Sequence, residues 1–287
     1  MSTLVWFDGE VRSGQDRLVT ALDRGLLVGD GVFDTCVVVA GRPFALRRHL
    51  ARLRRSAARV GLPEPPTDVI TRAALDLAAR LDGGTGRLRV TWTAGASAGG
   101  PGRTGGRPTL LVTAEPEQVA HPTPGSPPGS ARVAVVVVPW VRNERSPLAG
   151  VKSTSYAENV LALEYARSRG GEEAVLGNTR GELCEGSWSN VFLETDGALL
   201  TPPLSSGCLP GVTRELVLEW GTAAGLPLRE ATIPLDDFRT AEHAAVTSAT
   251  RGIVPVAALD GRELRPGPLT LRMQQVFADR VAEDLDP

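Results

Sequence analysis

The sequence predicts an α/β protein of the α+β kind, built as two domains. Three observations predict this. Segments with strand-like patterns outnumber those with helical periodicity. The chain has 287 residues, which suffices for two modest domains, each with a buried core. Residues 121–130 (HPTPGSPPGS) are too dense in proline and glycine to continue a helix or a central strand. We therefore expect a small α+β domain over 1–120, a linker over 121–130 and a strand-rich domain over 131–287.

The first predicted domain combines strands with two helices. A hairpin is expected at Asp8-Gly9, after the apolar run 4–7. Apolar residues recur with helical period over 44–60 and over 70–81. Strands are expected at 87–93 and 109–113, separated by a glycine-rich loop over 95–106. The glycines of 23–34 have neither the P-loop nor the dinucleotide-binding spacing, so we expect a tight loop there.

The first helix carries a second stripe, made of arginines, beside its apolar one. Its members are Arg48, Arg52, Arg55 and Arg59. A stripe of charges is usually a solvated face. The alternative is that one of these arginines turns inward to an anion, and the spacing alone does not say which.

The second predicted domain begins with a continuous β-branched run over 133–138, typical of a strand buried on both faces. Helices are expected over 156–169, with Ser153, Thr154 and Ser155 as N-cap candidates, from Pro210 to about Ala224, and from about Leu269 to Glu283. Further short strands are expected at 173–176, 191–194, 198–201, 233–238, 243–248 and 253–259.

Composition excludes several classes of protein. The net charge of −2 and pI of about 6.0 provide no basic surface for nucleic acid or an anionic membrane. No apolar run approaches the ~18 residues of a membrane span, and the N-terminus lacks the pattern of a signal peptide. The three cysteines and three histidines are scattered, so no disulfide framework, metal site or Ser-His triad is indicated. A cytoplasmic protein is expected.

Lys152 is the only lysine among the 31 basic residues. Arginine cannot lose its proton in a protein, whereas the free amine of lysine can attack a carbonyl and form a Schiff base. A single retained lysine is therefore a candidate for chemistry, although a chance remainder of an arginine-rich composition explains it equally well. Tyr156 follows four residues later; its ring could anchor the next helix or its hydroxyl could face the lysine.

Two small-residue turns and one acid complete a candidate site. Gly211 to Thr213 opens a helix with unpaired backbone N–H groups and a hydroxyl, and Ala249-Thr250 is a second hydroxyl-bearing turn; both suit a phosphate. Glu185 begins what we expect to be a polar turn before the strand at Val191. An amine, a phosphate cradle and a carboxylate are the groups that pyridoxal 5′-phosphate requires.

These residues lie in an order that resembles a known family. Glu185-x-Ser-x-x-Asn-Val-Phe, then Leu199-x-Thr, then Leu209-x-Gly-Val-x-Arg resembles the signature of the class IV (fold type IV) pyridoxal-phosphate aminotransferases. Segments 23–35, 49–53, 152–159 and 247–256 are similar to that family too, so the resemblance covers nearly the whole chain.

The resemblance implies a fold, an assembly and a set of roles. The larger domain would be a pseudo-barrel, with the cofactor between the domains and a homodimer closing the site near the subunit interface. Lys152 would hold the cofactor as a Schiff base and transfer protons, and Glu185 would bind the pyridine nitrogen. The resemblance also implies that Arg52 would reach the phosphate from its stripe. Val212, Thr213, Ala249 and Thr250 would contact the phosphate as well, with Leu209 on the ring and Tyr156 near the cofactor.

Within the family, residues 94–100 lack the Arg-x-His pair of the D-amino acid enzymes, and we find no match to the aromatic and arginine of the branched-chain enzymes. The Gly-Asp-Gly-Val-Phe run looks most like the 4-amino-4-deoxychorismate lyases, with departures at Val28, Asp34 and Trp188. The first hypothesis is thus a lyase that releases pyruvate and 4-aminobenzoate, a folate precursor. The alternatives are a transaminase of D- or branched-chain amino acids with a 2-oxo acid, and a cofactor-binding protein without turnover.

Overall fold

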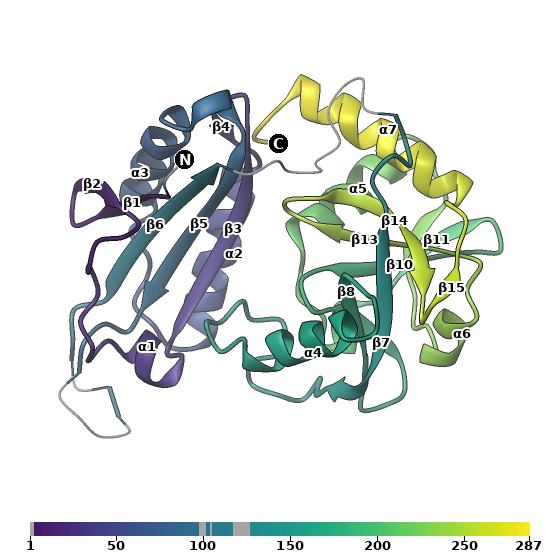
Figure 1. Cartoon of the computed structure of the whole chain (residues 1–287), viewed down its shortest axis with the longest axis horizontal. Helices are drawn as coiled ribbons and strands as arrows, with labels where there is room; N and C mark the ends of the chain where they lie inside the picture. Colours follow the sequence, from purple (N-terminus) through teal and green to yellow (C-terminus); the bar gives the residue numbers. More distant parts are fainter. Residues whose placement is uncertain (1–2, 98–101, 104, 117–126) are drawn as a thin grey trace. The chain divides into compact units, whose positions relative to one another are not determined.

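The computed structural model describes residues 3–97, 102–103, 105–116 and 127–287 (Figure 1). Its internal contacts divide the chain into two compact units. Unit 1 comprises Met1–Val119, Val151–Tyr156 and Asp284–Pro287, and unit 2 comprises Ala120–Gly150 and Ala157–Glu283. Two short segments that the predicted boundary counts with the second domain, 151–156 and 284–287, thus pack with the first. The reason is visible in their hydrogen bonds: Thr154 N–H donates to the Gly31 carbonyl and Ala45 N–H donates to the Leu285 carbonyl.

Unit 1 is built on a six-stranded antiparallel sheet of order β2-β1-β6-β5-β3-β4 (Figure 1). Its strands are β1 (Leu4–Phe7), β2 (Glu10–Ser13), β3 (Gly31–Val39), β4 (Arg42–Pro43), β5 (Gly86–Thr93) and β6 (Thr109–Pro116). Asp8 and Gly9 have positive φ at the β1–β2 hairpin, as the sequence predicts. Strands β3 and β5 present Phe33 and Arg89 on one face of this sheet, beside the candidate amine.

Helices α2 (Leu46–Arg59) and α3 (Thr67–Ala79) cover one face of this sheet. Leu50, Leu53 and Ala57 of α2 pack with Ile70 and Leu77 of α3 in the core of unit 1. This confirms both predicted amphipathic helices. The glycine-punctuated segment contains a short helix, α1 (Arg24–Val28), that was not predicted; the Asp23 carboxylate accepts from Gly25 N–H at its start, and Gly29 ends it with φ 66°.

Unit 2 contains a nine-stranded mixed sheet of order β12-β11-β10-β13-β14-β7-β8-β9, with β15 beside β14. Its strands are β7 (Val133–Arg142), β8 (Glu173–Asn178), β9 (Leu183–Gly186), β10 (Asn190–Thr195), β11 (Ala198–Thr201), β12 (Leu228–Glu230), β13 (His243–Ser248), β14 (Gly252–Leu259) and β15 (Arg262–Glu263). Strand β9, at one end of this order, also contacts β10 near the other end, so the sheet curls on itself. Val133 and Val135 of β7 face one core while Val136 and Val138 face another, as expected for a strand buried on both faces.

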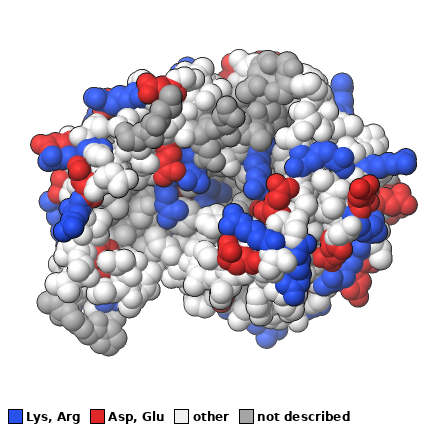
Figure 2. Space-filling model, in the orientation of Figure 1, with Lys and Arg blue, Asp and Glu red and all other residues white. Residues whose placement is uncertain are grey.

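The helices of unit 2 are α4 (Ala157–Arg167), α5 (Val212–Ala223), α6 (Leu235–Arg239) and α7 (Pro268–Glu283). Short 3-10 turns occupy Asp82–Gly84 in unit 1 and Leu204–Ser206 in unit 2. Helix α4 packs Ala162 and Ala166 on β7 and β8, whereas α5 and α7 lie together with Trp220 and Phe277 in contact (Figure 1). In the face that Figure 2 shows, acidic and basic side chains are interspersed.

Three local predictions are wrong. Residues 233–238 contain the helix α6 rather than a strand, because Pro234 precedes it and Asp236 and Asp237 favour its first turn. Glu185 lies on strand β9 rather than in a turn; the turn is Ser187 to Ser189. The residues Ser153 to Ser155 do not cap a helix, because the hydroxyls of Thr154 and Ser155 donate to the Gly29 carbonyl.

Most of the predicted linker, 121–126, and part of the glycine-rich loop, 98–101 and 104, lie outside the described residues. In the described part of the chain, no helix is both long and apolar enough to cross a membrane.

Candidate functional site

The segment that carries Lys152 is added to the edge of β3 in unit 1. The Lys152 carbonyl accepts from Phe33 N–H at 2.9 Å, and Ser153 bridges to Val32. Lys152 N–H donates to Ser56 Oγ of α2 at 3.3 Å. These backbone bonds fix the position of the lysine in unit 1, with Val151 in the core on one side.

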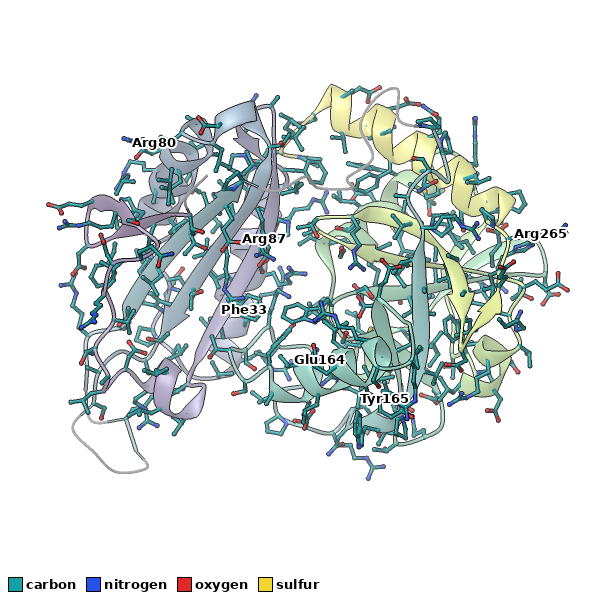
Figure 3. The ribbon with its side chains drawn as sticks, viewed as in Figure 1. Phe33, Arg80, Arg87, Glu164, Tyr165 and Arg265 are labelled. Carbon is teal, nitrogen blue, oxygen red and sulfur yellow. The ribbon has the colours of Figure 1, made fainter. Side chains whose placement is uncertain are left out.

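The Lys152 amine lies beside two aromatic rings, those of Phe33 and Tyr156. Its Nζ donates to the Tyr156 hydroxyl at 3.2 Å and lies 4.5 Å from the centroid of the Phe33 ring. The two rings meet edge to face at 4.9 Å (Phe33 is labelled in Figure 3). Both readings of Tyr156 therefore apply: its ring packs and its hydroxyl faces the lysine. The rings limit the positions that the amine can take, which favours a single attack geometry.

Arg89 of β5 is a cation on the same sheet face as Phe33. Its guanidinium carbon lies 3.7 Å from the Phe33 centroid and its Nε donates to Thr91 Oγ1 at 3.1 Å. Among the described residues it forms no ion pair, and burial lowers the pKa of Arg89. A partly buried cation without a carboxylate partner, beside a candidate amine, is arranged to receive an anion.

Arg52 turns inward from the arginine stripe, and Asp34 of β3 is the anion that it meets. Arg52 Nε and Nη2 donate to the two carboxylate oxygens at 2.9 and 2.7 Å, and His49 Nδ1 lies 2.7 Å from Asp34 Oδ1. Burial alone would raise the pKa of Asp34, but Arg52 and His49 outweigh it and hold that pKa well below its ordinary value. Burial lowers the pKa of His49, so the imidazole is neutral and donates from Nδ1. Asp34 thus orients Arg52.

In unit 2, Glu185 of β9 is 8% exposed and bound on both oxygens. Arg142 Nε donates to Oε1 at 3.0 Å, and Leu209 N–H donates to Oε2 at 2.8 Å. The Leu209 carbonyl in turn accepts from Asn190 Nδ2 at 2.9 Å. Each carboxylate oxygen has a second lone pair, so Glu185 can accept a further proton donor while its orientation stays fixed.

The start of α5 is the first predicted phosphate turn. Gly211 is its N-cap and supplies no side-chain cap, so the first backbone N–H groups, at Val212 and Thr213, have no capping side chain. A Cβ at Gly211 would lie 1.9 Å from Asn190 Oδ1, so only glycine fits there. This helix start has the features of an anion site.

The second predicted phosphate turn follows β13. Ala249 and Thr250 are half-buried in it, and Arg251 N–H donates to Ser248 Oγ at 3.3 Å. Thr247, directly before the turn, is 2% exposed, and its hydroxyl has no hydrogen-bond partner among the described residues. A buried hydroxyl without a partner is costly and indicates a ligand that completes it.

The structure groups the predicted residues by unit. Lys152, Tyr156 and Arg52 belong to unit 1, and Tyr156 is within hydrogen-bond distance of the lysine. Glu185, Leu209, Val212, Thr213, Ala249 and Thr250 belong to unit 2, where Leu209 is bonded to Glu185.

Other residues of the site were not predicted: Phe33, His49, Arg89, Arg142 and Thr247. The alternation of Arg89 with Leu88 and Val90 in the predicted strand is the signal that could have found it. Phe33, His49 and Thr247 lie in segments that resemble the family, but their contacts carry no mark in one sequence, and Arg142 carries none at all.

Comparison with known proteins gives consistent results. Residues 31–259 match the family model described as amino-transferase class IV. A Methanocaldococcus jannaschii protein provisionally assigned as a branched-chain-amino-acid aminotransferase is 31% identical, over 96% of this chain and 95% of its own length. A D-alanine aminotransferase of Staphylococcus aureus is 30% identical, over 95% of this chain and 96% of its own length.

Solved structures give the same fold. The crystal structure of a branched-chain aminotransferase from Thermoproteus uzoniensis with norvaline superposes with a TM-score of 0.89 at 28% identity, covering 99% of this chain and 96% of that one. A Legionella pneumophila protein provisionally assigned as a 4-amino-4-deoxychorismate lyase has a TM-score of 0.83 at 22% identity, covering 93% of this chain and 96% of that one. The second likeness shows a shared fold alone.

Proposed function

This chain belongs to the class IV aminotransferases, and we propose that it is a transaminase acting on a D-amino acid or a branched-chain amino acid with a 2-oxo acid as acceptor. Its fold is fold type IV, with an antiparallel N-terminal unit and a larger mixed pseudo-barrel unit. Its cofactor is pyridoxal 5′-phosphate. When bound, this cofactor supplies an aldehyde for an amine and a ring that accepts electrons.

The residues present fit that cofactor. The unpartnered Thr247 hydroxyl and the uncapped N–H groups at Val212 and Thr213 suit a phosphate. Glu185, held by Arg142, suits a protonated ring nitrogen. We therefore assign the phosphate to these groups with Ala249 and Thr250, the nitrogen to Glu185, and the ring contact to Leu209. Arg52, oriented by Asp34, is assigned to the phosphate as a further proposal.

Lys152 is the proton-moving residue in this proposal. It is the chain's only side chain with a primary amine, and Tyr156 and Phe33 hold its Nζ in place. A neutral Nζ would take the proton from the substrate's α-carbon and return it at a neighbouring position. The Tyr156 hydroxyl accepts a hydrogen bond from Nζ and so directs the remaining lone pair.

The observation that carries the proposal is that the Arg89 guanidinium has no carboxylate partner among the described residues and lies on the same Phe33 ring as the amine. Both substrates of a transaminase, the amino acid and the 2-oxo acid, carry a carboxylate. Arg89 can bind that carboxylate through a charge-assisted hydrogen bond. A carboxylate bound to Arg89 would place the substrate's α-carbon beside the Phe33 ring, near Lys152 Nζ.

The choice of transaminase over lyase rests on the relatives. Those that are about a third identical over nearly the whole chain are named as branched-chain and D-alanine aminotransferases. They support the alternative reading of the sequence better than the lyase, which is supported by the Gly-Asp-Gly-Val-Phe run and by a likeness of fold. Aminodeoxychorismate also carries carboxylates, so Arg89 alone does not separate the two activities.

One assay pair tests the proposal. The purified protein with added pyridoxal phosphate is incubated with 2-oxoglutarate and, separately, D-alanine, L-valine, L-leucine and L-isoleucine, and the glutamate formed is quantified with its chirality. In parallel the protein is incubated with aminodeoxychorismate. We expect glutamate from at least one amino acid. Production of 4-aminobenzoate without any glutamate would overturn the transaminase and restore the lyase.

A further inference from the structure

We propose that Glu173 is a positioning residue, which holds the Ser187 turn and the Arg251 turn of unit 2 in one arrangement and thereby sets the affinity for the cofactor. The inference rests on the cofactor site proposed above. Glu173 does not touch the groups assigned to the cofactor. It acts through two turns, one that follows Glu185 and one that contains Ala249 and Thr250.

Glu173, the first residue of β8, is a carboxylate with 1% exposure. Its Oε1 accepts from Ser187 Oγ at 2.5 Å and from Trp188 N–H at 3.1 Å. Its Oε2 lies 3.6 Å from Arg251 Nη1. One buried side chain therefore contacts two turns that are separated by some sixty residues in the sequence.

The first turn is held at every polar atom of Ser187. Ser187 N–H donates to the Ala174 carbonyl at 2.9 Å, and Asn159 Nδ2 donates to the Ser187 carbonyl at 2.5 Å. A Cβ at Gly186 would lie 3.3 Å from Glu173 Cδ and 2.1 Å from Ser189 Oγ, so the chain passes close to the carboxylate. The turn directly continues β9, which ends one residue after Glu185. Its position determines where that strand ends.

The second turn has one long-range charge partner. Arg251 follows Thr250, and its side chain is about one-third exposed (36%), so the guanidinium reaches inward to Glu173 from a partly solvated position. The pairing draws the turn toward β8. Without it, the turn keeps the local bond from Arg251 N–H to Ser248 Oγ and its strands β13 and β14, and loses the contact with Glu173.

The hydrogen bonds of Glu173 do not by themselves require a negative charge. A glutamine at this place could accept from Ser187 and Trp188 through its amide oxygen. A buried carboxylate costs free energy, and burial raises the pKa of Glu173 despite its partners. What the carboxylate offers beyond the amide is attraction to Arg251. The negative charge of Glu173 therefore serves to hold the second turn in position through Arg251.

The test measures pyridoxal phosphate affinity by quenching of tryptophan fluorescence when cofactor-free protein is refilled, together with the thermal midpoint of the cofactor-free protein. The variants are Glu173→Gln, Arg251→Leu and their combination. Glu172→Gln is the matched control, since Glu172 is adjacent and exposed. We expect the cofactor dissociation constant to rise about tenfold in each single variant, the scale of one bond to a charged group. The double variant should bind the cofactor no more weakly than the weaker-binding single variant.

A merely structural role gives a different result. In that case Glu173→Gln would shift the thermal midpoint while the dissociation constant stayed within about twofold of the parent value, and this would overturn the proposal. Additive losses in the double variant would overturn it too, because the two residues would then act separately. If Glu173→Gln does not fold, an unchanged cofactor dissociation constant in Arg251→Leu would likewise overturn the proposal. Amino transfer is not measured, so failure of the transaminase proposal leaves this result intact.

Discussion

Asp34 in unit 1 and Glu173 in unit 2 are both carboxylates with 1% exposure, yet their pKa values move in opposite directions. Asp34 meets Arg52 through two bonds and His49 through a third, and its pKa falls. Glu173 meets a hydroxyl, two backbone amides and an arginine at 3.6 Å, and its pKa rises. Burial opposes the charge at both places. The difference lies in whether a buried cation is bonded directly to the carboxylate.

The comparison separates two uses of a buried charge. Asp34 is compensated locally, and its removal would take from the buried Arg52 the carboxylate to which it donates two hydrogen bonds. Glu173 is compensated incompletely by a partner that is itself partly solvated, which is unfavourable for stability alone. Buried carboxylates with a perturbed pKa and a specific charge partner cluster at functional sites.

The largest expected effect is that of Asp34→Ala. Breaking a buried pair by removing one partner costs about 3–5 kcal/mol, since the remaining charge is left buried. Urea denaturation measures this as a loss of unfolding free energy. Asp76→Ala is the control, because Asp76 forms an exposed pair with Arg80 and should cost less than about 0.5 kcal/mol. Equal small losses in both variants would refute the claim that Asp34 is compensated by Arg52.

Arg89 is the opposite case to Asp34, a partly buried cation that forms no ion pair with a carboxylate in the described part of the chain. Arg89→Leu should lower kcat/KM for the transaminase reaction by about 10- to 100-fold through loss of a charge-assisted bond to the substrate, while leaving stability nearly unchanged. Arg87→Leu is the matched control on the same strand face, exposed and paired with Glu115. Steady-state kinetics of both variants check this. Equal values of kcat/KM in the two variants would contradict the assignment of Arg89 to the substrate carboxylate.

The smallest effects are those of pH on stability, and their signs differ between the two carboxylates. The pKa of Asp34 is lowered, so its contribution is present above its ordinary value of 3.8 and is lost as pH falls through that region. The pKa of Glu173 is raised, so the folded protein loses stability as pH rises above 4.5. The deficit of Asp34→Asn should therefore shrink in acid, whereas Glu173→Gln should gain on the parent from pH 4.5 to neutrality. Unfolding free energies measured from below pH 3.8 up to neutrality would contradict the comparison if both differences changed in the same direction with pH.

Helices and strands with strong periodicity could be predicted from the sequence, because burial of an apolar stripe decides them. Helix α2 and the buried strand β7 are examples. Helix α6 and the hydroxyls of Ser153 to Ser155 could not, since tertiary partners such as the Gly29 carbonyl decide their conformation. At the candidate site, chemistry and motif single out Lys152 and Glu185 in the sequence, and their roles stay predictions. The buried contacts of Asp34 and Glu173 could not be predicted, because nothing local marks a carboxylate whose partner lies on another element.

The most direct test of the account asks where the cofactor is bonded. The purified protein is loaded with pyridoxal 5′-phosphate and reduced with borohydride, and its peptides are then identified by mass spectrometry. The account predicts a phosphopyridoxyl group on Lys152, with no incorporation in Lys152→Arg, which keeps a charge but has no free amine. Stable incorporation at the N-terminal amine in place of Lys152, or the characteristic visible absorbance persisting in Lys152→Arg, would contradict it.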